Sequence, residues 1–168
     1  MTDASVRAQL SKDVMNYVIM ETESTNMVLN VTKVLATLQS EYQIQLVVLE
    51  RTDTLDFDEI PLERLTALKM LYPSVNNEAE TPGSQLFNRL YREKNNIAPS
   101  QFATRGFDVT FDAIMRLFQN EEFSDVMTSA ATEYVENKFI YTKSDEGNNN
   151  TGVYILQYNP DLSVTQAQ

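Results

Sequence analysis

Asn16-Tyr-Val-Ile-Met20 and Ile44-Gln-Leu-Val-Val-Leu49 are the two runs that decide the fold of this chain. Both are compact, apolar and rich in β-branched residues, as expected for strands buried in a parallel sheet. Between them, from Thr25 to Tyr42, apolar residues recur at three- and four-residue spacing, which predicts a helix with one buried stripe. Residues 16–49 therefore form the strand–helix–strand unit of an α/β fold, with a Rossmann-like parallel sheet and flanking helices.

The rest of the chain is expected to complete one domain. A chain of 168 residues, 42% of them hydrophobic, can bury a single core, so residues 1–168 are predicted to be one α/β domain. Within it, residues 1–76 hold the βαβ-type strands and helices, and residues 77–130 are helical. Residues 131–160 are aromatic and β-branched on both sides of a polar Gly/Asn segment, which predicts a C-terminal β-hairpin with a long tip.

Four individual elements are also expected within these segments. A helix is predicted over Val6–Val14, and a third strand over Leu68–Tyr72, where Pro73 stops it. A small helix is expected around Phe123–Met127. A longer helix over Arg105–Gln119 is predicted to bury its apolar residues Phe107, Phe111, Ile114, Met115 and Phe118.

The charge of the chain argues against nucleic acid as a partner. It has 13 Lys and Arg against 24 Asp and Glu, a formal net charge of −11. Binding to phosphates relies on clustered Lys and Arg, so nucleic acid and anionic membrane surfaces are both disfavoured.

The chain contains no His and no Cys, and this narrows the catalytic and metal-binding chemistry open to it. Without His or Cys, the chain cannot build a Ser-His-Asp or Cys-His triad, and metal sites lose their usual ligands. We therefore expect a protein that is not an enzyme and that holds no cofactor and no metal.

The sequence has no feature of a membrane span. No stretch approaches the roughly 20 consecutive apolar residues that cross a bilayer. Met1–Leu10 lack the charged start and apolar run of a signal peptide, so none is expected in this chain.

One stretch suggests a family. It reads Ala98-Pro-Ser-Gln-Phe-Ala-Thr-Arg-Gly-Phe-Asp108 and resembles the Tyr-Ala-x-x-Gly-Tyr-Asp-Ala segment of type I periplasmic binding proteins. The helix before it, with Tyr91-Arg-Glu-Lys94, is similar to the lead-in of that segment in the family. Residues 132–139 and 152–158 resemble envelope-associated bacterial members that can carry LysM repeats.

The resemblance implies a binding module that closes around a small molecule such as an amino acid, at the cell envelope or in the periplasm. It covers the second lobe and the segments after it, and nothing here supplies the strands of a first lobe. We therefore expect a C-terminal fragment of a longer protein. Helices that would pack on the missing sheet lead us to expect a homodimer through their exposed faces.

Candidate ligand-binding residues follow from the ends of the strands. Ligands of open α/β sheets bind beyond the carboxyl ends of the strands, near helix N-termini. This position selects Thr22, Glu23, Ser24, Thr25, Glu50, Arg51 and Tyr72. Alternatively, Ser24 and Thr25 only cap a helix and Arg51 is solvated. The family resemblance adds Arg105 and Phe107, whose alternative roles are a surface cation and a core residue.

Two acidic groups have simpler explanations than catalysis or metal binding. Asp108 and Asp112 are expected to complement a helix dipole. Asp53–Glu59 is rich in carboxylates but lacks the spacing of a calcium-binding loop, so it is expected to be a solvated loop.

The sequence therefore favours a non-enzymatic lobe that binds a small, amino-acid-like molecule. The alternative is a protein-interaction or scaffold domain that keeps the fold without binding a ligand.

Overall fold

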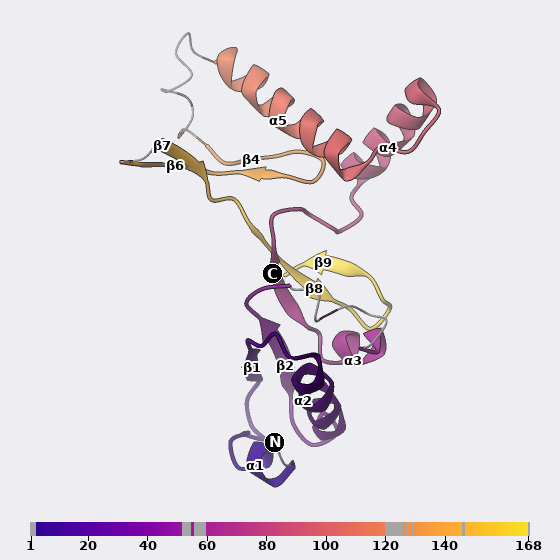
Figure 1. The fold of residues 1–168 in the computed structure, drawn as a ribbon, viewed down its shortest axis with the longest axis vertical. Helices are drawn as coiled ribbons and strands as arrows, with labels where there is room; N and C mark the ends of the chain where they lie inside the picture. Colours follow the sequence, from indigo (N-terminus) through magenta and orange to yellow (C-terminus); the bar gives the residue numbers. More distant parts are fainter. Residues whose placement is uncertain are drawn as a thin grey trace. The chain divides into compact units, whose positions relative to one another are not determined.

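The computed structural model describes residues 3–51, 55, 60–119, 126, 128, 130–145 and 147–167. The chain divides into two compact units (Figure 1). Unit 1 comprises Met1–Ser74 and Ile155–Gln168, and unit 2 comprises Val75–Tyr154. Most of the expected acidic loop Asp53–Glu59 and of the expected helix Phe123–Met127 lies outside the described residues.

Unit 1 is built on a five-stranded sheet with the strand order β1-β2-β3-β8-β9. The strands are β1 (Asn16–Met20), β2 (Ile44–Val48), β3 (Leu71–Ser74), β8 (Tyr154–Tyr158) and β9 (Val164–Gln166). β1, β2 and β3 are parallel, and β8 pairs with β9 antiparallel. The predicted βαβ unit and the α/β fold class are confirmed.

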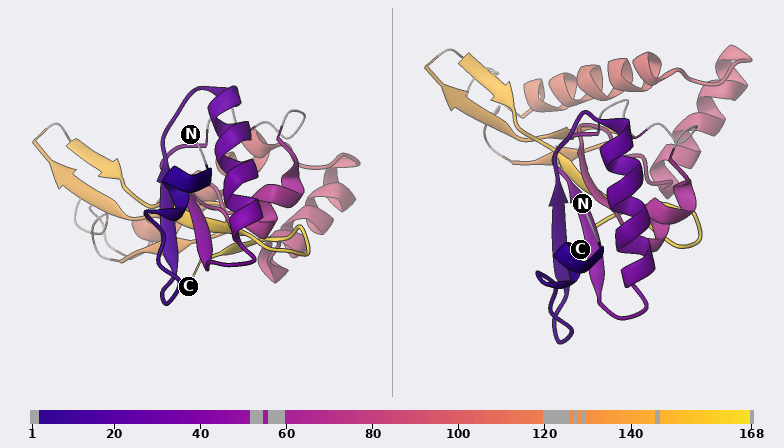
Figure 2. Two further views of the ribbon diagram at one scale, coloured as in Figure 1. Left: turned by 90° about the horizontal axis from the view of Figure 1, so that it is seen from below. Right: turned by 60° about the horizontal axis from the view of Figure 1, so that its bottom comes forward.

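The core of unit 1 lies between this sheet and the helices on one side of it, α2 (Thr25–Leu38) and α3 (Leu62–Ala67) (Figure 2). α2 buries one stripe because its apolar residues recur at helical spacing. Four residues of this core are fully buried: Leu46 in β2, Met70 just before β3, Leu35 in α2 and Leu65 in α3. A further short helix, α1 (Asp3–Arg7), is held by an ion pair of Arg7 with Glu41 at 2.6 Å.

Three local predictions in or near unit 1 were wrong. The first helix spans Asp3–Arg7 and not Val6–Val14. The third strand begins at Leu71 and continues through Pro73, because Leu68 still caps α3. The expected hairpin between residues 132–142 and 152–158 does not form, because β8 belongs to the main sheet.

The described part of unit 2 contains two long helices and two small antiparallel ribbons. α4 (Pro82–Asn95) starts with a capping box between Thr81 and Ser84, and α5 (Gln101–Leu117) is capped by Ser100. One ribbon pairs β4 (Thr132–Glu133) with β5 (Lys138–Phe139). The other pairs β6 (Tyr141–Ser144) with β7 (Gly147–Asn150).

The buried face of α5 is polar, contrary to the prediction. Thr104, Asp108, Asp112 and Arg116, four residues apart, are all buried. The Asp108 carboxylate accepts hydrogen bonds from the backbone N–H groups of residues 135–137 at 2.9–3.0 Å. The residues expected to be buried are instead exposed: Phe107, Phe111, Ile114, Met115 and Phe118.

Asp108 and Asp112 also lie beyond the first turn of α5, so they hold the following segment and do not complement the helix dipole.

Candidate functional site

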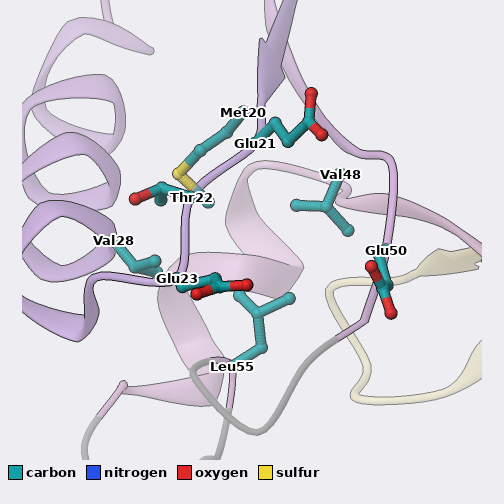
Figure 3. Close-up of a pocket in the computed structure, with 8 residues that line it drawn as sticks. All are labelled: Met20, Glu21, Thr22, Glu23, Val28, Val48, Glu50 and Leu55. Atoms are coloured by element: carbon teal, nitrogen blue, oxygen red, sulfur yellow. The ribbon is translucent and has the colours of Figure 1, made fainter.

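A pocket lies at the carboxyl ends of β1 and β2 in unit 1 (Figure 3). Its volume is about 140 Å³. The lining residues are Met20, Glu21, Thr22, Glu23, Val28, Val48, Glu50 and Leu55. Pockets that enclose a drug-sized ligand measure ~300–1,000 Å³, so this one suits a small polar group or one end of a ligand.

The start of α2 forms one wall of this region. Ser24 is the N-cap, and its hydroxyl accepts a hydrogen bond from the Met27 N–H at 3.4 Å. Thr22 accepts a hydrogen bond from the Ser24 N–H at 3.1 Å, which fixes the turn between β1 and α2. The first N–H groups of a helix have no partners within the helix, and the helix dipole makes this end attractive to an anion.

Carboxylates dominate the charge of the pocket. Figure 3 shows Glu23, before α2, and Glu50, after β2, on opposite sides, with Val48 and Leu55 between them. Glu21 also lines the pocket, and all three glutamates are exposed. The site thus places an acidic rim beside a helix N-terminus, an arrangement with complementary groups for both an ammonium and a carboxylate.

Arg51 and Tyr72 contact each other in unit 1. The Arg51 guanidinium lies 5.3 Å from the centre of the Tyr72 ring, at cation–π distance. Tyr72 is only 1% exposed, and its ring stacks on Tyr158 with centroids 5.2 Å apart. The Tyr72 ring is therefore largely covered by Tyr158 and by the exposed Arg51.

Two candidates from the resemblance, Arg105 and Phe107, belong to unit 2. Arg105 donates a hydrogen bond to Asn76 Oδ1 at 3.4 Å. Beside it, burial raises the pKa of Glu136, an effect that the nearby Asp108 strengthens and Arg105 opposes. Phe107 packs against Phe87 and Phe111, with ring centroids 4.9 and 5.5 Å away, and remains 41% exposed.

The structure thus brings together part of the predicted set. Thr22, Glu23 and Glu50 line one pocket, with Ser24 and Thr25 at the adjoining helix start. Their role in ligand binding stays a prediction, as does that of Arg51, Tyr72, Arg105 and Phe107. The sequence argument missed the apolar lining by Met20, Val28, Val48 and Leu55. Met20 and Val48 carried a usable signal, because they are the last residues of their strands.

The described part of the chain shows neither a metal cluster nor a membrane-spanning helix. It contains no group of three or more Asp or Glu side chains arranged to hold a metal ion. Among the same residues, no helix combines the length and apolarity of a bilayer span.

Comparison with solved structures identifies the fold. No family model matches the chain. No curated protein matches it either. A branched-chain amino acid ABC transporter periplasmic ligand-binding protein from Burkholderia xenovorans superposes with a TM-score of 0.55 at 8% identity, over 99% of this chain and 46% of that one.

Two further solved structures score lower. The branched-chain amino acid transporter substrate binding protein LivJ from Streptococcus pneumoniae, in complex with isoleucine, gives a TM-score of 0.43 at 14% identity, over 98% of this chain and 48% of that one. The leucine binding protein LivK from Thermotoga maritima gives 0.39 at 12% identity, over 92% and 43%.

The chain spans about half the length of these proteins. At 8% identity, the superposition on the Burkholderia protein establishes the fold alone. Over that span, this chain has the fold of a type I periplasmic binding protein, as the sequence resemblance predicted.

Proposed function

We propose that this chain is a non-enzymatic lobe of a periplasmic-binding-protein-like protein of the cell envelope, and that its strand-end pocket binds one end of an amino-acid-like molecule. The observation that carries the proposal is the pocket formed by Thr22, Glu23 and Glu50 beside the N-terminus of α2. In open α/β sheets this is the position where ligands bind.

The charges of the pocket favour a zwitterion over a simple anion. Glu21, Glu23 and Glu50 offer carboxylates to an ammonium group. The α2 N-terminus and the Thr22 and Ser24 hydroxyls offer donors to a carboxylate. Arg51 does not line the pocket but directly follows Glu50, which does. An amino acid carries both groups, and the apolar lining by Met20, Val28, Val48 and Leu55 suits an aliphatic side chain.

The similarity to the Burkholderia protein adds support for the ligand class and location. That protein is described as a periplasmic ligand-binding protein of a branched-chain amino acid ABC transporter. We extend its ligand class, amino acids, and its location to this chain. An association with LysM repeats stays a prediction from sequence.

The small size of the pocket is what we expect of a site that is completed only when two lobes close around the ligand. The pocket, at about 140 Å³, is smaller than the ~300–1,000 Å³ of typical enclosed ligand sites, so in this proposal one lobe supplies one wall of the site. A second wall would contact the ligand only in a closed state, and the ligand would shift the population towards that state through these added contacts.

Calorimetric titration with L-leucine, L-isoleucine and L-glutamate tests the proposal. We expect at least one of them to bind and to show a loss of affinity of tenfold or more in Thr22→Val and Arg51→Gln, which each remove a charged or polar contact worth ~1.5–3 kcal/mol. Ser24→Ala should weaken binding in the same way.

Ser100→Ala is the matched control for Ser24→Ala. Both serines cap a helix by accepting a backbone N–H, from Met27 and from Ala103, so both substitutions remove a cap. Only Ser24 adjoins the pocket. Equal loss of affinity in the two variants, or no binding of any of the three amino acids, would contradict the proposal.

The alternative function, a protein-interaction or scaffold domain, is favoured by a different observation. The described residues include many large exposed hydrophobic side chains, gathered on α4, α5 and one face of the sheet. Unchanged partner binding in Thr22→Val, Ser24→Ala and Arg51→Gln would support this alternative.

A further inference from the structure

The chain enters unit 2 at Val75, and its first residues there are held by a turn that is distant in sequence. We call residues 75–77 the crossing segment. The turn comprises residues 134–137, which we call the clamp turn, and it is closed by a hydrogen bond from the Tyr134 N–H to the Asn137 carbonyl oxygen at 3.1 Å. Both segments belong to unit 2.

Three hydrogen bonds join the clamp turn to the crossing segment. The Asn77 N–H donates to the Glu136 carbonyl oxygen at 2.7 Å. The side-chain amide of Asn137 donates to the Val75 carbonyl oxygen at 3.2 Å and to Asn76 Oδ1 at 2.9 Å. Because Asn137 is only 8% exposed, little water competes for these bonds.

Glu136 places an acid in this contact. Its backbone N–H donates to the Asp108 carboxylate at 2.9 Å, so ionisation of Glu136 would add a second negative charge beside this buried one. Among the residues that the structure describes, Glu136 Oε2 is buried and has no hydrogen-bond partner. A buried carboxyl oxygen without a donor favours the neutral, protonated acid.

Two charged groups act on the Glu136 carboxyl, and both lie on α5. Burial raises the pKa of Glu136, and Asp108 raises it further, whereas Arg105 and a hydrogen bond with the Thr104 hydroxyl lower it. The crossing segment brings only neutral side chains to the contact. The net effect is a raised pKa, because burial is the largest contribution.

The ribbon that carries the clamp turn adds no net charge. Tyr134 stays neutral, since burial raises its pKa above the ordinary value of 10.0. Glu133 and Lys138, on the two sides of the turn, form an ion pair with each other at 2.9 Å. Glu136 is therefore the group whose titration changes the charge of this contact.

We propose that the clamp turn is a proton-dependent device that holds the crossing segment while Glu136 is protonated and releases it when Glu136 ionises. The sign follows from linkage. An acid that binds its proton more tightly in the closed clamp stabilises the closed form at low pH, and this stabilisation is lost as the pH rises through the raised pKa. The proposal concerns residues outside the strand-end pocket and does not depend on ligand binding.

Amide hydrogen exchange, measured by NMR from acid to neutral pH, tests the clamp. The protection factor of the Asn77 amide, corrected for the intrinsic exchange rate, should fall as the pH rises. Linkage sets the size of the fall at about tenfold for each unit by which the pKa of Glu136 in the clamp exceeds its ordinary value. That pKa is measured separately from the ¹³C shift of the Glu136 carboxyl. A protection factor that stays constant through the titration of Glu136 would overturn the proposal.

The Gly152 amide is the matched reporter near the second crossing. The chain leaves unit 2 after Tyr154, and the Gly152 N–H donates to Asn150 Oδ1 at 3.0 Å, an acceptor that does not titrate. Its protection factor should not follow the titration of Glu136. An equal fall at Asn77 and Gly152 would show that the whole unit opens, and would overturn the proposal of a local clamp.

Three variants complete the test. Glu136→Gln keeps the shape of the side chain and should make the protection of Asn77 independent of pH. Glu133→Gln is the matched control, because Glu133 lies on the same ribbon with its side chain 45% exposed, and it should leave the pH dependence in place. Arg105→Gln removes the cation that favours the ionised form, so it should move the fall to higher pH.

Three results with these variants would overturn the proposal. They are a pH dependence that survives Glu136→Gln, a pH dependence that Glu133→Gln abolishes, and a fall that Arg105→Gln moves to lower pH.

Discussion

Replacing Arg116 should strongly destabilise unit 2. Its side chain is 2% exposed and forms an ion pair with Asp112, which is 0% exposed, at 2.8 Å. The guanidinium also donates to the carbonyl oxygens of Val126 and Ala130 at 2.9 and 3.1 Å, and to the Thr132 hydroxyl at 3.1 Å. Arg116 therefore holds the segment after α5 against the helix.

The magnitude follows from what Arg116→Met leaves behind. The Asp112 carboxylate would stay buried with hydrogen bonds from Thr132 and Tyr141 but without its counter-charge. Removing one partner of a buried ion pair costs ~3–5 kcal/mol, a large part of the ~5–15 kcal/mol that stabilises a typical domain. We expect a loss of this size in the free energy of unfolding.

Urea unfolding, followed by circular dichroism and by tyrosine fluorescence, measures this loss. Tyrosine is the suitable fluorophore because the chain has eight Tyr and no Trp. Hydrogen exchange in the 101–117 peptide assigns it to α5. The double variant Asp112→Leu/Arg116→Met removes both charges and should lose less stability than Arg116→Met alone. A loss below about 1 kcal/mol in Arg116→Met, or a double variant less stable than the single one, would refute the reasoning.

Three further predictions follow from other contacts. Asp108→Ala removes the acceptor of three backbone N–H groups and should abolish hydrogen-exchange protection at residues 135–137, whereas retained protection would contradict their assignment to this carboxylate. Burial raises the pKa of Glu136 above 4.5, so its contribution to stability is present below pH 4.5 and is lost as the pH rises through the raised value. Glu136→Gln should therefore raise the urea midpoint at neutral pH relative to the unchanged chain, and should have less effect at acid pH. If the two proteins differ in urea midpoint by the same amount at both pH values, the reasoning is refuted. A Cβ at Gly152 would lie 2.3 Å from the Lys138 carbonyl oxygen, so Gly152→Ala should cost ~1–3 kcal/mol in thermal unfolding, and a neutral effect would show that this backbone approach is not required.

The sequence predicted the parts of the fold that depend on local pattern. The runs at 16–20 and 44–48 are strands, and the segment between them is a helix that starts at Thr25. In these segments the periodicity of apolar residues matches the surface that is buried in the structure.

The predictions failed where burial depends on distant residues. α5 has the pattern of an ordinary amphipathic helix, but its buried stripe is polar. Backbone N–H groups of residues 135–137 satisfy Asp108, and the carbonyl oxygens of Val126 and Ala130 satisfy Arg116. The spacing of Thr104, Asp108, Asp112 and Arg116 was a visible signal, yet only the tertiary partners show that it faces inward. β8 alternates between buried and more exposed residues, as its sequence pattern predicts for a strand. Its place in the main sheet depends on pairing with strands that are distant in sequence, which the local pattern does not show.

The position of the candidate site could be predicted from the sequence, but only some of the residues that line it could. The rule that ligands bind at the carboxyl ends of strands selected Thr22, Glu23 and Glu50, which share a pocket. Tyr72 also follows this rule, but stacking on Tyr158, which is distant in sequence, buries it. The contribution of Leu55 could not be anticipated, because its approach to the pocket depends on the path of the chain after β2.

The central claim is that the strand-end pocket binds an amino-acid-like molecule, and an NMR titration of the ¹⁵N-labelled chain with L-leucine tests it most directly. The proposal predicts saturable shifts at the backbone amides of Thr22–Asn26 and of Glu50 and Arg51, with little change at those of Ser100–Ala103, which form the start of the other serine-capped helix. An unchanged spectrum with L-leucine, L-isoleucine and L-glutamate, or shifts that avoid the residues around the pocket, would contradict it.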